Sequence, residues 1–164
     1  GRDVIAVGKI FDIFDGEGVT EKIKTTGNTN GIAFTKALQT RDFEGLAFVN
    51  LVDFDMLYGH RRDVAGYAAA ATEFDKFVAD FIPGMREGDI LMVTADHGCD
   101  PSYTKTTDHT REYVPYLICG KGVKPGVDLG TRLCFGTIAH TICDYLGVDA
   151  STLDGKSVLS DILK

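Results

Sequence analysis

The sequence has few basic residues, no long apolar run and no closely paired cysteines, and each shortage excludes a class of protein. Its 17 Lys and Arg residues are outnumbered by 24 Asp and Glu residues, which gives a net charge of −7. Nucleic acids and anionic membranes are bound by clustered Lys and Arg, so we expect neither as a partner. No apolar run approaches the roughly 20 residues of a membrane-spanning helix. A negative balance is compatible with a cation site, because a metal neutralises its acidic ligands.

The four cysteines are too far apart to form a C-x-x-C pair. They are Cys99, Cys119, Cys134 and Cys143. Zinc-ribbon and thioredoxin-type proteins are therefore excluded. Cys119 and Cys143 lie in patterns typical of small core residues. The first residues show no signal-peptide pattern, so we expect reduced thiols in a cytoplasmic protein.

Length and hydrophobic pattern predict the fold class. The 164 residues, 44% of them hydrophobic, fit one globular domain over 1–164. We expect strands at 3–7, 19–24, 45–52, 90–95 and 113–120, and helices at 9–15, 30–39, 63–81, 135–146 and 157–163. This alternation predicts an α/β fold, a three-layer α/β/α sandwich with a mostly parallel sheet. The long helix is expected to begin at Asp63, a residue that favours helix N-caps.

The stretch from Ile90 to Ala95 predicts a buried strand, and it breaks directly into Asp96-His97-Gly98. In open α/β sheets, ligands bind just beyond the carboxyl ends of strands. A neutral imidazole beside a carboxylate is a natural pair of ligands for a divalent metal. On its own, the triplet is equally compatible with a loop in which His97 bonds a carbonyl group.

Further Asp and His residues favour a metal site over the loop interpretation. Asp55 and His60 follow the strand at 45–52, and His109 lies in the loop after Asp96 and His97. A parallel sheet would place these loops on one edge. Mixed His and Asp ligands suit Mn, Zn or Fe better than Ca. Five such groups suit two metal ions about 3.5–4 Å apart, an arrangement that clamps a phosphoryl group in transfer. Cys99, close to His97, is an alternative ligand.

Two cationic side chains are candidates for substrate binding. Arg111 either binds a phosphate through its planar guanidinium or pairs with Asp108 or Glu112. Lys9 comes directly after the first strand and is the second candidate.

Two other residues serve as comparisons. Asp53 is near Asp55 but would point to the opposite side if strand geometry persists, so we expect it to support the ligands indirectly. His140 lies inside the last long helix, and we interpret it as structural.

Three segments resemble the metal-binding motifs of phosphopentomutases, a family of the alkaline phosphatase superfamily. They are Asp55-Met-Leu-Tyr-Gly-His60, Thr94-Ala-Asp-His-Gly98 and Asp108-His-Thr-Arg-Glu-Tyr-Val-Pro115. Gly8-Lys-Ile10 and Asp15-Gly-Glu-Gly-Val-Thr20 also resemble that family, so the resemblance covers nearly the whole chain. Cofactor-independent phosphoglycerate mutases share Thr-Ala-Asp-His-Gly, but their Asp and His ligands are four residues apart. Here Asp55 and His60 are five apart.

The resemblance implies a metal-dependent mutase. Asp55, His60 and His109 would hold one Mn²⁺, and Asp96 and His97 would help to hold a second. The family interconverts ribose or deoxyribose 1-phosphate and 5-phosphate, so the expected partner is a small sugar phosphate. Its reaction passes through a phosphorylated threonine of the enzyme and a sugar bisphosphate.

One departure from the family limits this expectation. In phosphopentomutases, the phosphorylated threonine and another aspartate ligand come from an N-terminal segment, and a cap domain follows it. No residue of this chain matches that threonine. We therefore expect 1–164 to be the C-terminal part of the catalytic core, with no catalytic nucleophile of its own. The alternatives are another phosphatase or mutase of the superfamily, such as a phosphoglycerate mutase, or a metal-binding fragment without turnover.

Overall fold

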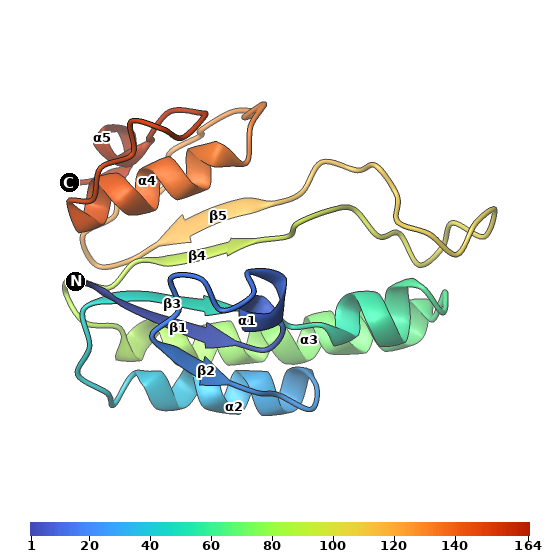
Figure 1. Ribbon diagram of the computed structural model, residues 1–164. Helices are drawn as coiled ribbons and strands as arrows, with labels where there is room; N and C mark the ends of the chain where they lie inside the picture. The colour runs from blue at the N-terminus through green and yellow to red at the C-terminus, as the bar shows by residue number, and fades with distance from the viewer. The chain divides into compact units, whose positions relative to one another are not determined.

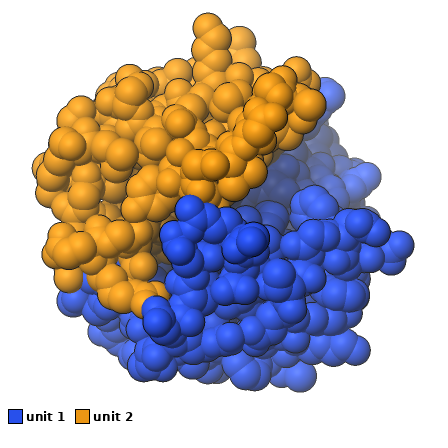
Figure 2. Space-filling model, turned by 60° about the vertical axis from the view of Figure 1, so that its left-hand side comes forward, with its two compact units in different colours: residues 1–85, 94–116 blue, residues 86–93, 117–164 orange.

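The computed structural model describes all 164 residues, which form two compact units coloured separately in Figure 2. Unit 1 comprises residues 1–85 and 94–116, and unit 2 comprises residues 86–93 and 117–164. Each unit is therefore built from two separate segments of the chain. The sequence-based assignment of one domain to residues 1–164 stays a prediction.

A three-stranded parallel sheet is the centre of unit 1 (Figure 1). Its order is β2 (Glu21–Ile23), β1 (Asp3–Val7) and β3 (Gly45–Val49), and β1 pairs in parallel with both neighbours. Ile5, Ala6 and Val7 of the middle strand are fully buried. This continuous apolar run is typical of a strand covered on both faces. Because the three strands are parallel, the residues that follow them meet at one edge.

The helices of unit 1 are α1 (Ile10–Ile13), α2 (Asn28–Leu38) and α3 (Val64–Phe81), followed by a short 3₁₀ helix, η2 (Ile82–Gly84). Leu38 of α2 packs with Ile5 and Val7 in the core of the unit. The Asp63 carboxylate accepts the Gly66 N–H at 2.8 Å, which confirms the predicted N-cap of α3. The cap fixes where the chain leaves the sheet edge.

The turn after β1 requires glycine. Gly8 has a φ of +85°, and a Cβ at this position would lie 2.5 Å from the Asn50 carbonyl oxygen. Asn50 N in turn donates to the Val7 carbonyl oxygen at 3.0 Å. The close approach that glycine permits holds the segment after β1 against the segment after β3.

Unit 2 contains most of a two-stranded sheet of β4 (Leu91–Thr94) and β5 (Tyr116–Cys119), whose arrows run in opposite directions in Figure 1; Thr94 and Tyr116 belong to unit 1. Its helices are α4 (Gly136–Leu146) and α5 (Leu159–Ile162). Gly147 ends α4 in the left-handed conformation, with a φ of +66°. The buried Thr141 hydroxyl donates to the Thr137 carbonyl and accepts the Val158 N–H, which ties the two helices together.

The structure bears out the expected strands and helices but shortens four of the five strands. The strand predicted at 45–52 ends at Val49, and that at 113–120 begins at Tyr116. A π-helix, η1 (Phe54–Gly59), follows β3 and has no counterpart in the sequence prediction. None of the helices combines the length and apolar character needed to cross a membrane.

Candidate metal centre

The π-helix brings Asp55 and His60 together. The His60 N–H donates to the Asp55 carbonyl oxygen at 2.9 Å, which is an i→i+5 hydrogen bond. This turn holds one residue more than an α-helical turn, so residues five apart lie on one side. His60 Nε2 accordingly lies 3.2 Å from Asp55 Oδ1. The five-residue spacing is thus accommodated by the backbone and not by side-chain reach.

Other side chains converge on the same carboxylate oxygen. His109 Nε2 lies 3.4 Å from Asp55 Oδ1, and Cys99 Sγ lies 3.6 Å from it. Asp55, His97 and His109 each offer a ligand atom, and these three atoms lie within 4.8 Å of one another. The His97 and His109 rings stack, with 3.7 Å between their centroids. All these residues lie in unit 1, three of them on the loop that follows β4.

Asp55, His60, His97 and His109 are called the cluster. Hydrogen bonds to backbone carbonyl groups determine which nitrogens of the His60 and His97 rings face it. His60 Nδ1 lies 2.5 Å from the Thr107 oxygen, and His97 Nδ1 lies 3.1 Å from the Gly98 oxygen. A carbonyl oxygen only accepts, so each Nδ1 carries the proton and each Nε2 of the neutral ring keeps its lone pair. Such a bond fixes the tautomer of metal-binding histidines in the same way.

This donor set fits a divalent metal ion. The His60 Nε2 lone pair faces the Asp55 carboxylate, so two acceptors oppose each other without a proton between them when the ring is neutral. A cation satisfies both. The Asp55 side chain is 32% exposed, so the cluster is reachable from solvent. Imidazole nitrogen with carboxylate oxygen is a combination suited to Mn, Fe or Zn.

Cys99 contacts the cluster as a hydrogen-bond donor. Burial first, and then the charge of Asp55, raises the pKa of the Cys99 thiol, so the thiol is protonated and donates to Asp55 Oδ1. The buried Gly59 allows this approach, because a Cβ at residue 59 would collide with Cys99 Sγ. Cys99 therefore supports the position of the Asp55 carboxylate.

The remaining predicted site residues lie around the cluster. The Asp96 side chain is 77% exposed, and its Oδ1 lies 3.6 Å from His97 Nε2. Lys9 is exposed, and its Nζ lies 2.8 Å from the sulfur of Met56, the residue after Asp55. Lys9 thus reaches the sheet edge where the π-helix begins. Its role in binding substrate stays a prediction.

Arg111 and Asp53 differ in their surroundings. Arg111 is exposed and forms an ion pair with neither Asp108 nor Glu112. The Asp53 carboxylate accepts the Asn28 N–H at 2.6 Å, and the Asp53 N–H donates to Asn28 Oδ1 at 3.0 Å. This reciprocal pair ties the start of α2 to the start of the π-helix, so Asp53 influences the position of the ligands only through the backbone.

Sequence reasoning missed a hollow of about 260 Å³ beside His97. Tyr67 of α3 and residues on both arms of the loop line it, among them Pro101, Glu112 and Val114. Burial raises the pKa of the Tyr67 hydroxyl. The residues that line the hollow are distant in sequence, so no local sequence pattern predicts it.

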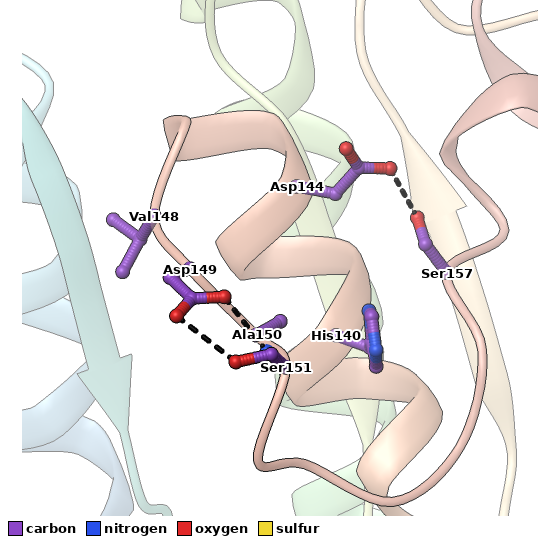
Figure 3. A pocket seen from close by; sticks show the side chains of 7 residues that line it. All are labelled: His140, Asp144, Val148, Asp149, Ala150, Ser151 and Ser157. Atoms are coloured by element: carbon purple, nitrogen blue, oxygen red, sulfur yellow. Dashed lines mark hydrogen bonds between the residues drawn. The ribbon is translucent and has the colours of Figure 1, made fainter.

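His140 lies in unit 2, in another hollow of about 380 Å³ (Figure 3). The carboxylates in this hollow already accept hydroxyl hydrogens, Asp144 from Ser157 at 2.7 Å and Asp149 from Ser151 at 3.0 Å. His140 Nδ1 is buried and without a hydrogen-bond partner. These side chains do not form a cluster of metal-ligand atoms, and the structural interpretation of His140 stays a prediction.

Known proteins resemble this chain over most of its length. Residues 4–150 match the metalloenzyme superfamily. The chain is 53% identical to the phosphopentomutase of Acetivibrio thermocellus over 99% of its length and 42% of that protein. It is 52% identical to the phosphopentomutase of Lachnoclostridium phytofermentans and 50% identical to that of Anaeromyxobacter sp. (strain K), over the whole chain in both. It spans about two fifths of the length of these curated relatives. The predicted resemblance to phosphopentomutases is confirmed.

A solved structure of Leishmania mexicana phosphoglycerate mutase, studied at low cobalt concentration, has a similar fold. It matches with a TM-score of 0.72 and 18% identity, over 96% of this chain and 37% of that one. At this identity the likeness concerns the fold alone. It confirms the predicted α/β class with a mostly parallel sheet and an alkaline phosphatase-like fold.

Proposed function

The chain belongs to the metalloenzyme superfamily, and we propose that it is the metal-binding part of a manganese-dependent phosphopentomutase. One observation carries the proposal: in a chain half identical to phosphopentomutases, one Asp55 oxygen lies within 3.4 Å of both His60 Nε2 and His109 Nε2. Because the chain spans about two fifths of these relatives, the activity belongs to the whole protein.

The proposed ligand sets follow the motifs. Asp55, His60 and His109 would hold one Mn²⁺, and Asp96 and His97 would help to hold a second. The mutual closeness of the Asp55, His97 and His109 ligand atoms supports two sites in one neighbourhood. When bound, such ions stabilise the negative charge on the oxygens of a phosphoryl group in transfer.

The chain's own residues would orient the ligands and attract the substrate. The carbonyl groups of Thr107 and Gly98 hold the His60 and His97 rings with Nε2 turned toward the cluster. Lys9 and Arg111 are exposed cations and would bind the phosphate of a pentose phosphate. Their positions after β1 and on the loop that carries His109 support this role.

The nucleophile is proposed to lie outside residues 1–164. The Thr110 hydroxyl, which is close to His109 in sequence, donates to Glu112 at 2.5 Å and accepts the Asp100 N–H at 2.7 Å. It therefore maintains the loop. Phosphoryl transfer through a covalent intermediate needs an activated nucleophile in addition to metal ions. The assignment of this chain to the C-terminal part of a catalytic core, and its cytoplasmic location, stay predictions.

A substrate comparison tests the proposal. The complete gene product, purified and supplied with Mn²⁺, is expected to convert ribose 1-phosphate to ribose 5-phosphate. It should leave 3-phosphoglycerate unchanged under the same conditions. Conversion of 3-phosphoglycerate to 2-phosphoglycerate without action on ribose 1-phosphate would instead favour a phosphoglycerate mutase. Removal of Mn²⁺ by a chelator should abolish turnover, and added Mn²⁺ should restore it.

A further inference from the structure

Arg62 uses every N–H group of its side chain to bind backbone carbonyl oxygens. Nε donates to Thr106 at 3.0 Å, and Nη2 donates to Thr106 at 2.5 Å and to Asp108 at 2.6 Å. Nη1 donates to Gly59 at 3.1 Å and to Asp100 at 3.0 Å. A guanidinium has five N–H donors, so all are engaged. None is left for a substrate phosphate.

The four carbonyl groups lie beside residues of the cluster. Gly59 directly precedes His60, and Asp108 directly precedes His109. Thr106 precedes Thr107, whose carbonyl oxygen fixes the His60 ring. One side chain therefore joins the end of the π-helix to the loop at 98–112 at points next to two proposed ligands.

The backbone at Arg62 supports a specific role for this side chain. Its φ is +56°, in the left-handed region that disfavours residues with a Cβ. Such a conformation persists only where the surrounding contacts determine it. The residue lies between His60 and Asp63, the N-cap of helix α3. The left-handed turn directs the chain from the metal cluster into that helix while the guanidinium holds the loop.

We propose that Arg62 is a positioning residue of the metal centre, which sets the distance between His60 on the π-helix and His109 on the loop. This inference rests on the proposed metal site and adds a residue that the motifs do not assign. Arg62 acts through the backbone and contacts no ligand atom. Its function is to preorganise the ligands, so that binding a metal does not have to order the loop.

If Arg62 influenced the site only through its charge, removing Arg62 would change the metal affinity in the direction opposite to that expected for a positioning residue. A positive charge beside a cation site repels the metal, so its loss should strengthen binding. Loss of a group that orients ligands weakens it, typically by 10- to 100-fold. The sign of the change in Mn²⁺ affinity therefore distinguishes the two roles. Arg61 provides a matched control, because it is adjacent, exposed and outside the hydrogen-bond network.

The experiment compares Arg62→Gly, Arg62→Lys and Arg61→Ala in the complete gene product. Glycine accepts the left-handed backbone, so Arg62→Gly removes the guanidinium without adding strain. We expect its Mn²⁺ affinity, measured by calorimetry, to fall at least about 10-fold. Arg62→Lys should also bind weakly, because a single ammonium cannot reach four carbonyl groups. Arg61→Ala should bind like the wild type.

Two further readouts separate positioning from a general loss of structure. Millimolar guanidinium ion should restore part of the Mn²⁺ affinity of Arg62→Gly and leave the wild type unchanged. Without metal, amide hydrogen exchange in residues 98–112 should be faster in Arg62→Gly than in Arg61→Ala, while exchange in β1 stays the same. Unchanged or tighter Mn²⁺ binding by Arg62→Gly would overturn the inference. A wild type that binds no Mn²⁺ would refute the proposed metal site instead, and the exchange data would still show whether Arg62 holds the loop.

Discussion

His60 Nε2 lies 3.2 Å from Asp55 Oδ1 because the backbone between these residues forms a π turn. A π turn is an α turn with one residue inserted. Residues four apart on an α-helix occupy the same relative place. A spacing of four on an α turn and a spacing of five on a π turn are therefore two ways of placing an aspartate beside a histidine.

This relationship predicts an asymmetry between deletion and insertion. Deleting Leu57, a residue that is 42% exposed, should convert the π turn to an α turn and keep Asp55 beside His60. The Mn²⁺-induced rise in melting temperature should then persist. Inserting an alanine after Leu57 makes the spacing six, separates the pair and should remove the rise. A deletion that loses the shift while the insertion keeps it would contradict the π-turn account.

Mn²⁺ should stabilise the 164-residue chain, because a ligand that binds only the folded state adds free energy by mass action. At a concentration 100 times the dissociation constant, this amounts to about 2.7 kcal/mol. Asp55→Ala and His60→Ala should each abolish most of the shift in thermal melting. His140→Ala is the control and should keep the shift, because His140 lies in the other unit. Loss of the shift in that variant would refute the structural interpretation of His140.

The pair of Glu21 and Arg41 predicts a pH dependence of stability that involves no metal. Arg41 donates to both Glu21 carboxylate oxygens, at 2.8 and 2.6 Å, and these bonds lower the pKa of Glu21 below its usual 4.5. The stabilisation is fully present above that ordinary pKa and is lost as pH falls through the lower, folded-state pKa.

Glu21→Gln should therefore lower the melting temperature at pH 7 and have little effect at the acid end of the accessible range. Melting curves recorded in metal-free buffer from pH 7 down to the acid end of that range measure this change in melting temperature. Glu17→Gln, at an exposed residue on the same unit, is the control and should change little at either pH. A difference for Glu21→Gln that grows as pH falls would contradict the assignment.

The isolated chain should bind Mn²⁺ without catalysing the reaction. One ion should bind through Asp55, His60 and His109, and a second more weakly, since only Asp96 and His97 are proposed to hold it. Conversion of ribose 1-phosphate should be undetectable with residues 1–164 and readily measured with the complete gene product in the same Mn²⁺ buffer. Turnover by the chain at a rate near that of the complete protein would place the nucleophile within these residues.

Local patterns were sufficient to predict most elements. Continuous apolar runs predicted β1, β3 and β4, and the apolar stripe with Asp63 before it predicted α3 and its cap. The end of β3 was misplaced because Leu51 and Val52 continue the apolar run, although the Val52 carbonyl already accepts the Met56 N–H of the next helix. Hydrophobicity alone does not distinguish a strand end from a helix start.

The sequence predicted which Asp and His residues form the cluster, but it did not predict the hydrogen bonds that hold them in place. Asp and His residues after successive strands share one sheet edge, a consequence of topology alone. Four of the five hydrogen bonds of Arg62 reach residues 38 to 46 positions away in sequence, and these four depend on the folded loop. The Arg61-Arg62 pair looks like ordinary surface charge in the sequence. Only the folded structure shows that Arg62 binds the loop while Arg61 is exposed.

Asp55, His60 and His109 are proposed to bind Mn²⁺. Crystals grown with Mn²⁺ and measured near the manganese absorption edge test this binding, because the anomalous difference map locates the ion independently of any assay. We predict a peak in direct coordination with Asp55 Oδ1, His60 Nε2 and His109 Nε2. A map without a peak at these atoms, or with its strongest peak at the hollow beside His140, would contradict the account.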